Sequence, residues 1–247
     1  MNKKQFSLVF LTAVITTIFT QALITSALTN PVESAPAGAS IEKNASLSDI
    51  ENKIFEDIWK KTFHYTTFFE SLDGFHVSGN ASVDGNQLIF VTEDKENSTV
   101  KVSKTPSWQG LATFSQKSRF RTAFTMTNRN NVEAYLSIGG HEGKSYGFKI
   151  VNDKLYGYSN DGTKELAVLL QTITNDTYNV EARYKPNEVI VFYVNSKNRG
   201  ELTKGFPSAS QLPNHQLMEM SLKTNDSLQK SFQVSVFEYL QMRNVLK

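Results

Sequence analysis

The residues of this 247-residue chain that could bind a ligand are charged and aromatic side chains that alternate with apolar ones. In an extended strand, successive side chains point to opposite faces, so these polar positions are turned away from the core that their apolar neighbours fill. Tyrosine rings can pack on the C–H faces of sugars, while charged groups make directed hydrogen bonds to hydroxyls. Cross-strand pairing on a solvated sheet uses the same residue types and is the alternative. The candidate ligand-binding residues are Arg121, Glu133, Tyr135, Lys149, Tyr156, Arg183 and Tyr193.

Several enzyme classes have no support in the sequence. The chain contains no cysteine, which excludes disulfides, thiol nucleophiles and Cys-ligated metal centres. Neither a phosphate-binding P-loop nor a dinucleotide-binding glycine motif occurs, so nothing indicates nucleotide hydrolysis or hydride transfer.

Metal-binding patterns are weak. The densest acidic stretch, residues 93–96, holds three carboxylates and a lysine at a predicted turn, which is typical of a solvated loop. Calcium accepts carboxylate and carbonyl oxygens from turns, so Ca²⁺ is conceivable there or at Asp73 or Asp161, although no specific motif supports it. We therefore expect no cofactor and no metal ligand. The four histidines lack metal-binding spacing, and we interpret all of them as structural: His64, His76, His141 and His215.

The charge balance argues against nucleic acid as a partner. The formal net charge is +2, and Lys3 and Lys4 are the only charged residues before position 28. The remainder carries equal numbers of acidic and basic groups and no basic block, so it exerts no long-range attraction on a polyanion.

The elements that must position the candidate residues are strands. From Phe68 onward, short apolar runs of period two alternate with Gly, Asn and Asp turns, which is typical of an all-β domain with two packed sheets. In residues 145–165, Asn152-Asp153 and Asn160-Asp161-Gly162 predict the turns of a hairpin. The nine expected strands lie at 86–92, 120–126, 132–139, 146–151, 154–159, 178–184, 189–195, 216–222 and 232–240.

Three segments precede this domain. Residues 1–28 follow the layout of an export signal, with two lysines before a long uncharged stretch, and they are either cleaved or kept as a membrane anchor. Residues 29–47 are poor in large apolar groups and predict a linker. Residues 48–63 begin with a capping box and repeat apolar residues at helical spacing, which predicts an amphipathic helix.

The order of the strand motifs resembles that of the concanavalin A-like lectin and glucanase superfamily, especially its laminin G-like domains. The stretches "GFHVSGNASVDGNQLIF", "SRFRTAFTM", "YGFKIVNDKLYGYSNDGTKE" and "VIVFYVNSKNRGELTKGFP" are similar to successive strands of such domains. The resemblance implies a jelly-roll sandwich of two antiparallel sheets over residues 68–247. It also implies glycan binding or adhesion as the usual role, with glycoside cleavage in some branches. The Glu-x-Asp-x-Glu strand of the hydrolase branch has no equivalent here.

These observations favour a non-catalytic, lectin-like module that is secreted or displayed on the cell surface. Its expected partner is a polysaccharide or a glycan of the cell envelope, and it would meet a membrane only through an uncleaved N-terminal segment. A glycoside hydrolase or lyase of the same fold and a structural subunit of the cell envelope are the alternatives.

Overall fold

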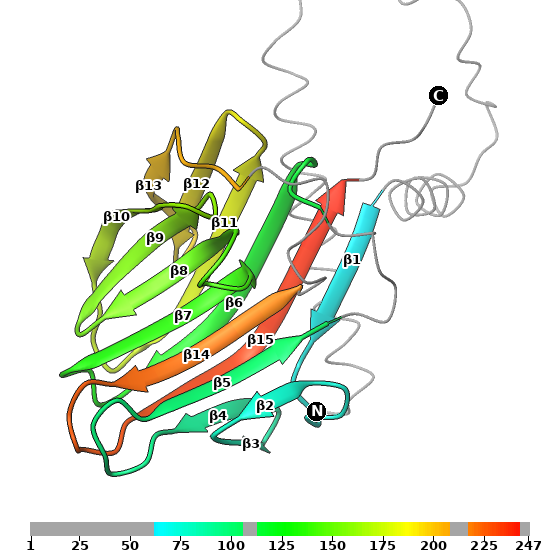
Figure 1. Cartoon of the computed structure of the whole chain (residues 1–247). Helices are drawn as coiled ribbons and strands as arrows, with labels where there is room; N and C mark the ends of the chain where they lie inside the picture. Colours follow the sequence, from blue (N-terminus) through cyan, green and yellow to red (C-terminus); the bar gives the residue numbers. More distant parts are fainter. Residues whose placement is uncertain (1–61, 106–112, 208–216, 243–247) are drawn as a thin grey trace, which may run out of the picture. The chain divides into compact units, whose positions relative to one another are not determined.

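The computed structural model describes residues 62–105, 113–207 and 217–242, and these form a sandwich of two antiparallel sheets. The eight-stranded sheet, sheet A, has the order β13-β12-β11-β6-β15-β4-β3, and β1 also pairs with β15 (Figure 1). The seven-stranded sheet, sheet B, has the order β10-β9-β8-β7-β14-β5-β2. The strands are β1 (Thr62–Thr67), β2 (His76–Ser78), β3 (Asn80–Asp84), β4 (Gln87–Val91), β5 (Thr99–Lys104), β6 (Ser118–Met126), β7 (Val132–Gly139), β8 (Ser145–Val151), β9 (Lys154–Asn160), β10 (Glu165–Thr172), β11 (Thr177–Lys185), β12 (Val189–Val194), β13 (Lys197–Leu202), β14 (Met218–Thr224) and β15 (Ser231–Met242).

The core between the sheets is rich in aromatic rings. Phe148 of sheet B lies between Phe120 and Phe192 of sheet A, with ring centroids 6.0 and 5.7 Å away. Tyr146 of sheet B stacks on Tyr184 of sheet A at 5.0 Å. All five side chains are buried, as expected for large rings that stabilise a fold without disulfides.

The turns follow from residues that accept a left-handed backbone. Asn152, in the two-residue turn between β8 and β9, has φ 55°, and Gly162 after β9 has φ 96°. Val151 pairs with Lys154 across the first turn, so the predicted hairpin is confirmed.

The all-β class and the nine expected strands are confirmed, but six further strands were missed. These are β1, β2, β3, β5, β10 and β13, most of which are short or lie at sheet edges, where alternation is weak. The expected strand 178–184 corresponds to β11, and 216–222 corresponds to β14.

The N-terminal boundary of the sandwich differs from the expectation. The signal or anchor segment 1–28, the linker 29–47 and most of the predicted helix 48–63 lie outside the described residues. The last two residues of that helix, Thr62 and Phe63, belong instead to β1, which pairs with β15 along its whole length. Phe63 and Tyr65 alternate toward the core, so the sandwich begins at Thr62 and not at 68. Within the described ranges, no helix is long and apolar enough to cross a membrane.

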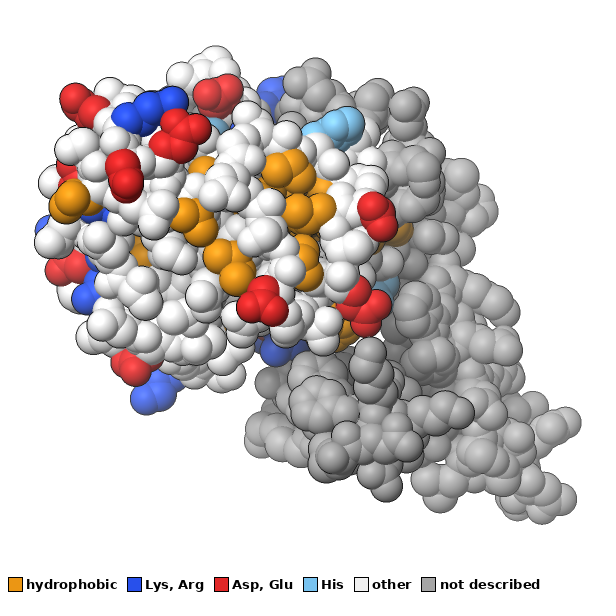
Figure 2. Space-filling model, turned by 90° about the horizontal axis from the view of Figure 1, so that it is seen from below, with side chains coloured by type: hydrophobic (Ala, Val, Ile, Leu, Met, Phe, Trp, Pro, Cys, Tyr) orange, Lys and Arg blue, Asp and Glu red, His pale blue; other side chains and the backbone are white. Residues whose placement is uncertain are grey.

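The underside of the sandwich exposes apolar side chains where both sheets end. Figure 2 shows hydrophobic side chains gathered near the centre of this face, with acidic side chains around them. The edge strands β2 and β3 lie here; Val77 is 41% exposed, while Ala81 and Val83 pack partly against the core.

Candidate functional site

The seven candidate ligand-binding residues occupy the outer faces of two different sheets. On sheet B lie Glu133 and Tyr135 of β7, Lys149 of β8 and Tyr156 of β9. On sheet A lie Arg121 of β6, Arg183 of β11 and Tyr193 of β12. Because the core separates the two sheets, one small ligand cannot contact all seven, and the two groups are two separate surfaces.

On sheet B, Lys149 holds two carboxylates together. Its Nζ lies 3.0 Å from Glu133 and 2.9 Å from Glu165 of β10. The Tyr135 hydroxyl donates to Glu133 at 2.9 Å and lies 3.4 Å from Glu165. Burial raises the pKa of Glu133, but hydrogen bonds from Lys149 and Tyr135 outweigh it, so the pKa lies below its ordinary value. This cluster is a closed ion-pair network, in which Glu133 is ionised at neutral pH.

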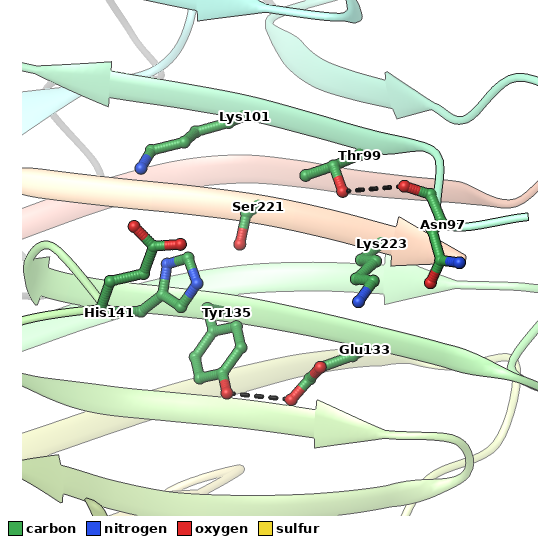
Figure 3. Close-up of a pocket in the computed structure, with 9 residues that line it drawn as sticks. Asn97, Thr99, Lys101, Glu133, Tyr135, His141, Ser221 and Lys223 are labelled. Atoms are coloured by element: carbon green, nitrogen blue, oxygen red, sulfur yellow. Dashed lines mark hydrogen bonds between the residues drawn. The ribbon is translucent and has the colours of Figure 1, made fainter. Parts of the chain in front are cut away.

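A pocket of about 400 Å³ opens beside this cluster, above β5, β14 and β7 (Figure 3). Strand register places one row of its residues side by side, since Lys101 pairs with Ser221, and Ser221 with Tyr135. The same row continues through Lys149 to Tyr156, which lies beyond the pocket. The lining residues are Asn97, Thr99, Lys101, Glu133, Tyr135, His141, Glu142, Ser221 and Lys223.

A buried carboxylate lies at one end of this pocket. The side chain of Glu219 is 1% exposed, and it accepts hydrogen bonds from Lys101 Nζ at 2.5 Å and from the His141 backbone N–H at 3.4 Å. Nδ1 of the His141 ring is bonded to the same carboxylate. A buried carboxylate without partners would be strongly destabilising, so Lys101 and His141 hold Glu219 in its charged form.

The loop after β7 brings His141 over the sheet. Gly139 has φ 79°, and a Cβ there would lie 2.4 Å from the carbonyl oxygen of Lys144, so only glycine fits this turn. Gly143 donates to Gly140 at 2.9 Å, and Asn160 donates to the His141 carbonyl at 3.3 Å. These contacts fix the imidazole at the end of the pocket.

His141, and not Tyr135, presents a ring to the pocket. The two rings face each other in Figure 3 and stack with centroids 4.3 Å apart. Tyr158 packs edge-on against Tyr135 at 5.4 Å. Tyr135 is therefore only 8% exposed, whereas the side chain of His141 is 21% exposed. The face of Tyr135 that the sequence offered for stacking is largely covered by its own neighbours.

On sheet A, the candidate arginine Arg121 belongs to a chain of ion pairs. It lies 3.2 Å from Glu181 and 3.5 Å from Glu238, and Arg119 lies 2.8 Å from Glu238. Burial raises the pKa of Glu238, but the hydrogen bond from His64 and the charges of both arginines outweigh it and lower the pKa to about 2. This surface therefore has a clear structural role.

The other two candidates on sheet A extend this chain of ion pairs. Arg183 contacts Glu181 at 2.5 Å and covers the ring of Tyr193 at 4.4 Å.

One sequence pattern matches that of a catalytic serine, but its serine has a structural role. Residues 143–147, GKSYG, match the Gly-x-Ser-x-Gly pattern of hydrolase elbows. Ser145, however, starts strand β8, is 0% exposed, and bonds the Gly143 carbonyl at 3.2 Å and the Tyr158 hydroxyl at 3.4 Å. An elbow needs an exposed serine at a strand-to-helix turn, so this serine cannot attack a substrate.

Metal ligands do not converge in the described residues, where no group of three or more His, Asp or Glu side chains could hold an ion. The acidic loop 93–96 is exposed, and Lys95 pairs with Glu93 at 2.5 Å. Asp161 accepts hydrogen bonds from Thr163 and Lys164, which close its own turn.

Sequence reasoning missed three residues of the site, Lys101, His141 and Glu219. The sequence predicts a structural role for His141 because it lacks metal-binding spacing, and its partner Glu219 lies 78 residues later in the chain. A signal did exist in β14, where Glu219, Ser221 and Lys223 alternate with Met218, Met220 and Leu222 as the outward positions of a strand.

Comparisons with known proteins identify the fold. No family model and no curated protein sequence matches the chain. Among solved structures, a prokaryotic beta-1,3-1,4-glucanase (lichenase) from a mouse hindgut metagenome aligns with a TM-score of 0.56 and 8% identity, over 71% of this chain and 98% of that one. A protein of unknown function from Shewanella oneidensis MR-1 aligns with a TM-score of 0.55 and 11% identity, over 89% and 99%. The CBM2 module of the evolved Dit of Lactobacillus casei BL23 phage J-1 aligns with a TM-score of 0.53 and 13% identity, over 74% and 97%. At these identities the likeness concerns the fold, and the chain has the concanavalin A-like lectin/glucanase fold.

Proposed function

We propose that this protein is a non-catalytic module that binds a glycan in the pocket on sheet B. The observation that carries the proposal is the stacked pair of Tyr135 and His141 above the buried Glu219, next to an open pocket of about 400 Å³. Small-molecule binding sites combine aromatic side chains with a few fixed polar groups in the same way. The shared fold with a lichenase and a CBM2 module supports a carbohydrate ligand by analogy.

The position of Lys149 speaks against glycoside hydrolysis at this site. Since Glu133 and Glu165 both contact Lys149, their contacting oxygens are less than about 6 Å apart, which is a spacing that retaining glycosidases use. In a retaining enzyme the sugar reacts between the two carboxyl groups. Here the ammonium of Lys149 is bonded to both groups and occupies the space between them. The pair is thus built to stabilise the sheet.

The localisation follows from the sequence alone. We infer that residues 1–28 direct export, so that the module is secreted or held at the cell surface. A glycan of the cell envelope or of the surroundings is then its partner.

A glycan array tests the proposal. Wild-type protein is expected to be retained on at least one polysaccharide, and the variant His141→Ala is expected to lose retention. Because this variant also removes a partner of the buried Glu219, its thermal midpoint should fall, and retention is measured well below that midpoint. Arg183→Ala, on the opposite sheet, is the matched control and should be retained like the wild type. A blank array, or equal retention of all three proteins, contradicts the proposal. Release of reducing sugar from any retained polysaccharide would instead reveal an enzyme.

A further inference from the structure

The charges around the sheet B pocket determine which glycans it can accept. Four carboxylates lie in or directly beside the pocket, Glu133, Glu142, Glu165 and Glu219, against three lysines, Lys101, Lys149 and Lys223. The sum over these carboxylates and lysines is one negative charge. A local excess of negative charge repels polyanions.

Two of the three lysines are already paired with carboxylates of the protein. Lys101 is paired with the buried Glu219 at 2.5 Å, and Lys149 is shared by Glu133 and Glu165. The charge of Lys223 acts on Glu133, whose pKa it helps to lower. An acidic sugar would have to compete with a carboxylate of the protein at Lys101 and at Lys149.

The buried carboxylate also determines the chemistry of His141. An ionised carboxylate can only accept hydrogen bonds, so the Nδ1 bonded to Glu219 must carry a proton. In the neutral imidazole, Nε2 is then an acceptor, and within the described residues no protein group is bonded to it.

The remaining lining groups offer donors opposite this acceptor. Figure 3 shows Lys223 and Asn97 at the other end of the pocket from His141, with Ser221 between the two ends. Hydroxyl groups of a sugar both donate and accept, so they match an imidazole acceptor at one end and amide, ammonium and hydroxyl donors at the other.

We propose that the pocket selects neutral glycans, with a sugar hydroxyl donating a hydrogen bond to Nε2 of His141, and that Glu219 is the positioning residue that keeps this nitrogen an acceptor. The inference depends on the proposed glycan-binding function. Beyond glycan binding, the ligand is then a neutral sugar that donates one hydrogen bond to His141.

The first test compares neutral and acidic polysaccharides on one array with the full chain. Neutral glucans, xylans, mannans and galactans are expected to retain the protein, while polygalacturonate, alginate and heparin are not. Stronger retention on the acidic set overturns the inference and leaves the proposed function standing. Retention on neither set overturns both. Lys154→Gln, which changes an exposed charge of β9 outside the pocket, is the charge control and should leave the ranking unchanged.

The second test observes the imidazole directly. Nitrogen-15 NMR of the wild-type protein should show a protonated Nδ1 and an unprotonated Nε2 at His141, and a protonated Nε2 overturns the assignment. Glu219→Gln lets the other tautomer form, so binding to a neutral glycan should weaken by roughly tenfold, the effect of one lost hydrogen bond. If that variant fails to fold, the wild-type spectrum still decides the question.

Discussion

Replacing Glu238 by glutamine is expected to destabilise the fold at neutral pH and to leave the pocket intact. Glu238 lies on sheet A, where its side chain is 19% exposed and contacts Arg119 at 2.8 Å and Arg121 at 3.5 Å. A glutamine keeps the shape of the side chain but removes its charge, so both arginines lose part of their electrostatic stabilisation.

The magnitude follows from the lowered pKa of Glu238. The ordinary value of 4.5 falls to about 2 in the folded state. Since one pH unit corresponds to 1.36 kcal/mol, the ionised form stabilises the fold by about 3 kcal/mol at neutral pH. Because the pKa is lowered, this contribution is fully present above pH 4.5 and is lost as the pH falls from 4.5 to about 2.

Urea unfolding at several pH values measures this contribution. The difference in free energy of unfolding between wild type and Glu238→Gln should be about 3 kcal/mol near pH 7 and should vanish near pH 2. Glu201→Gln, at an exposed position of β13, is the control and should cost little at any pH. A difference that does not change with pH would refute the reasoning, because it would show that the charge of Glu238 is not what stabilises sheet A.

Two further variants test the packing and the network of sheet B. Gly157→Ala places a Cβ 2.4 Å from the ring of Phe192, so the free energy of unfolding, measured by urea titration, should fall by about 1–3 kcal/mol. Gly143→Ala is the control, because its Cβ would have no atom closer than 3.8 Å, and it should change the free energy of unfolding less. Equal effects would show that the sheets do not pack this closely. Lys149→Gln removes the main partner that lowers the pKa of Glu133, so a carbon-13 NMR titration should find this pKa higher than in the wild type; an unchanged value would contradict the ion-pair network.

The sequence predicts which side chains of a strand point inward and which point outward, because this alternation is a local property. In β6, Phe120 and Phe124 are buried while Arg121 and Thr125 are partly exposed, as alternation predicts. This alternation separates inward from outward side chains, but it does not predict which of the two sheets a strand belongs to. β11 pairs with β6, although four strands lie between them in the chain, and this pairing puts Arg183 on the sheet opposite to Glu133.

The centre of the candidate site could not be read because it depends on contacts between distant segments. His141 comes from a loop, Glu219 from a strand 78 residues later, and Lys101 from a second strand, β5. Each residue alone has an ordinary structural explanation. Only the order β7-β14-β5 brings the three together, and strand order follows from the packing of the whole domain.

The most direct test of glycan binding on sheet B is amide chemical-shift mapping with a polysaccharide fragment that the array retains. We expect shifts around the pocket, at Thr99, His141, Ser221 and Lys223, with little change on the other sheet. Shifts that cluster around Arg121 on sheet A, with the pocket unchanged, would contradict it.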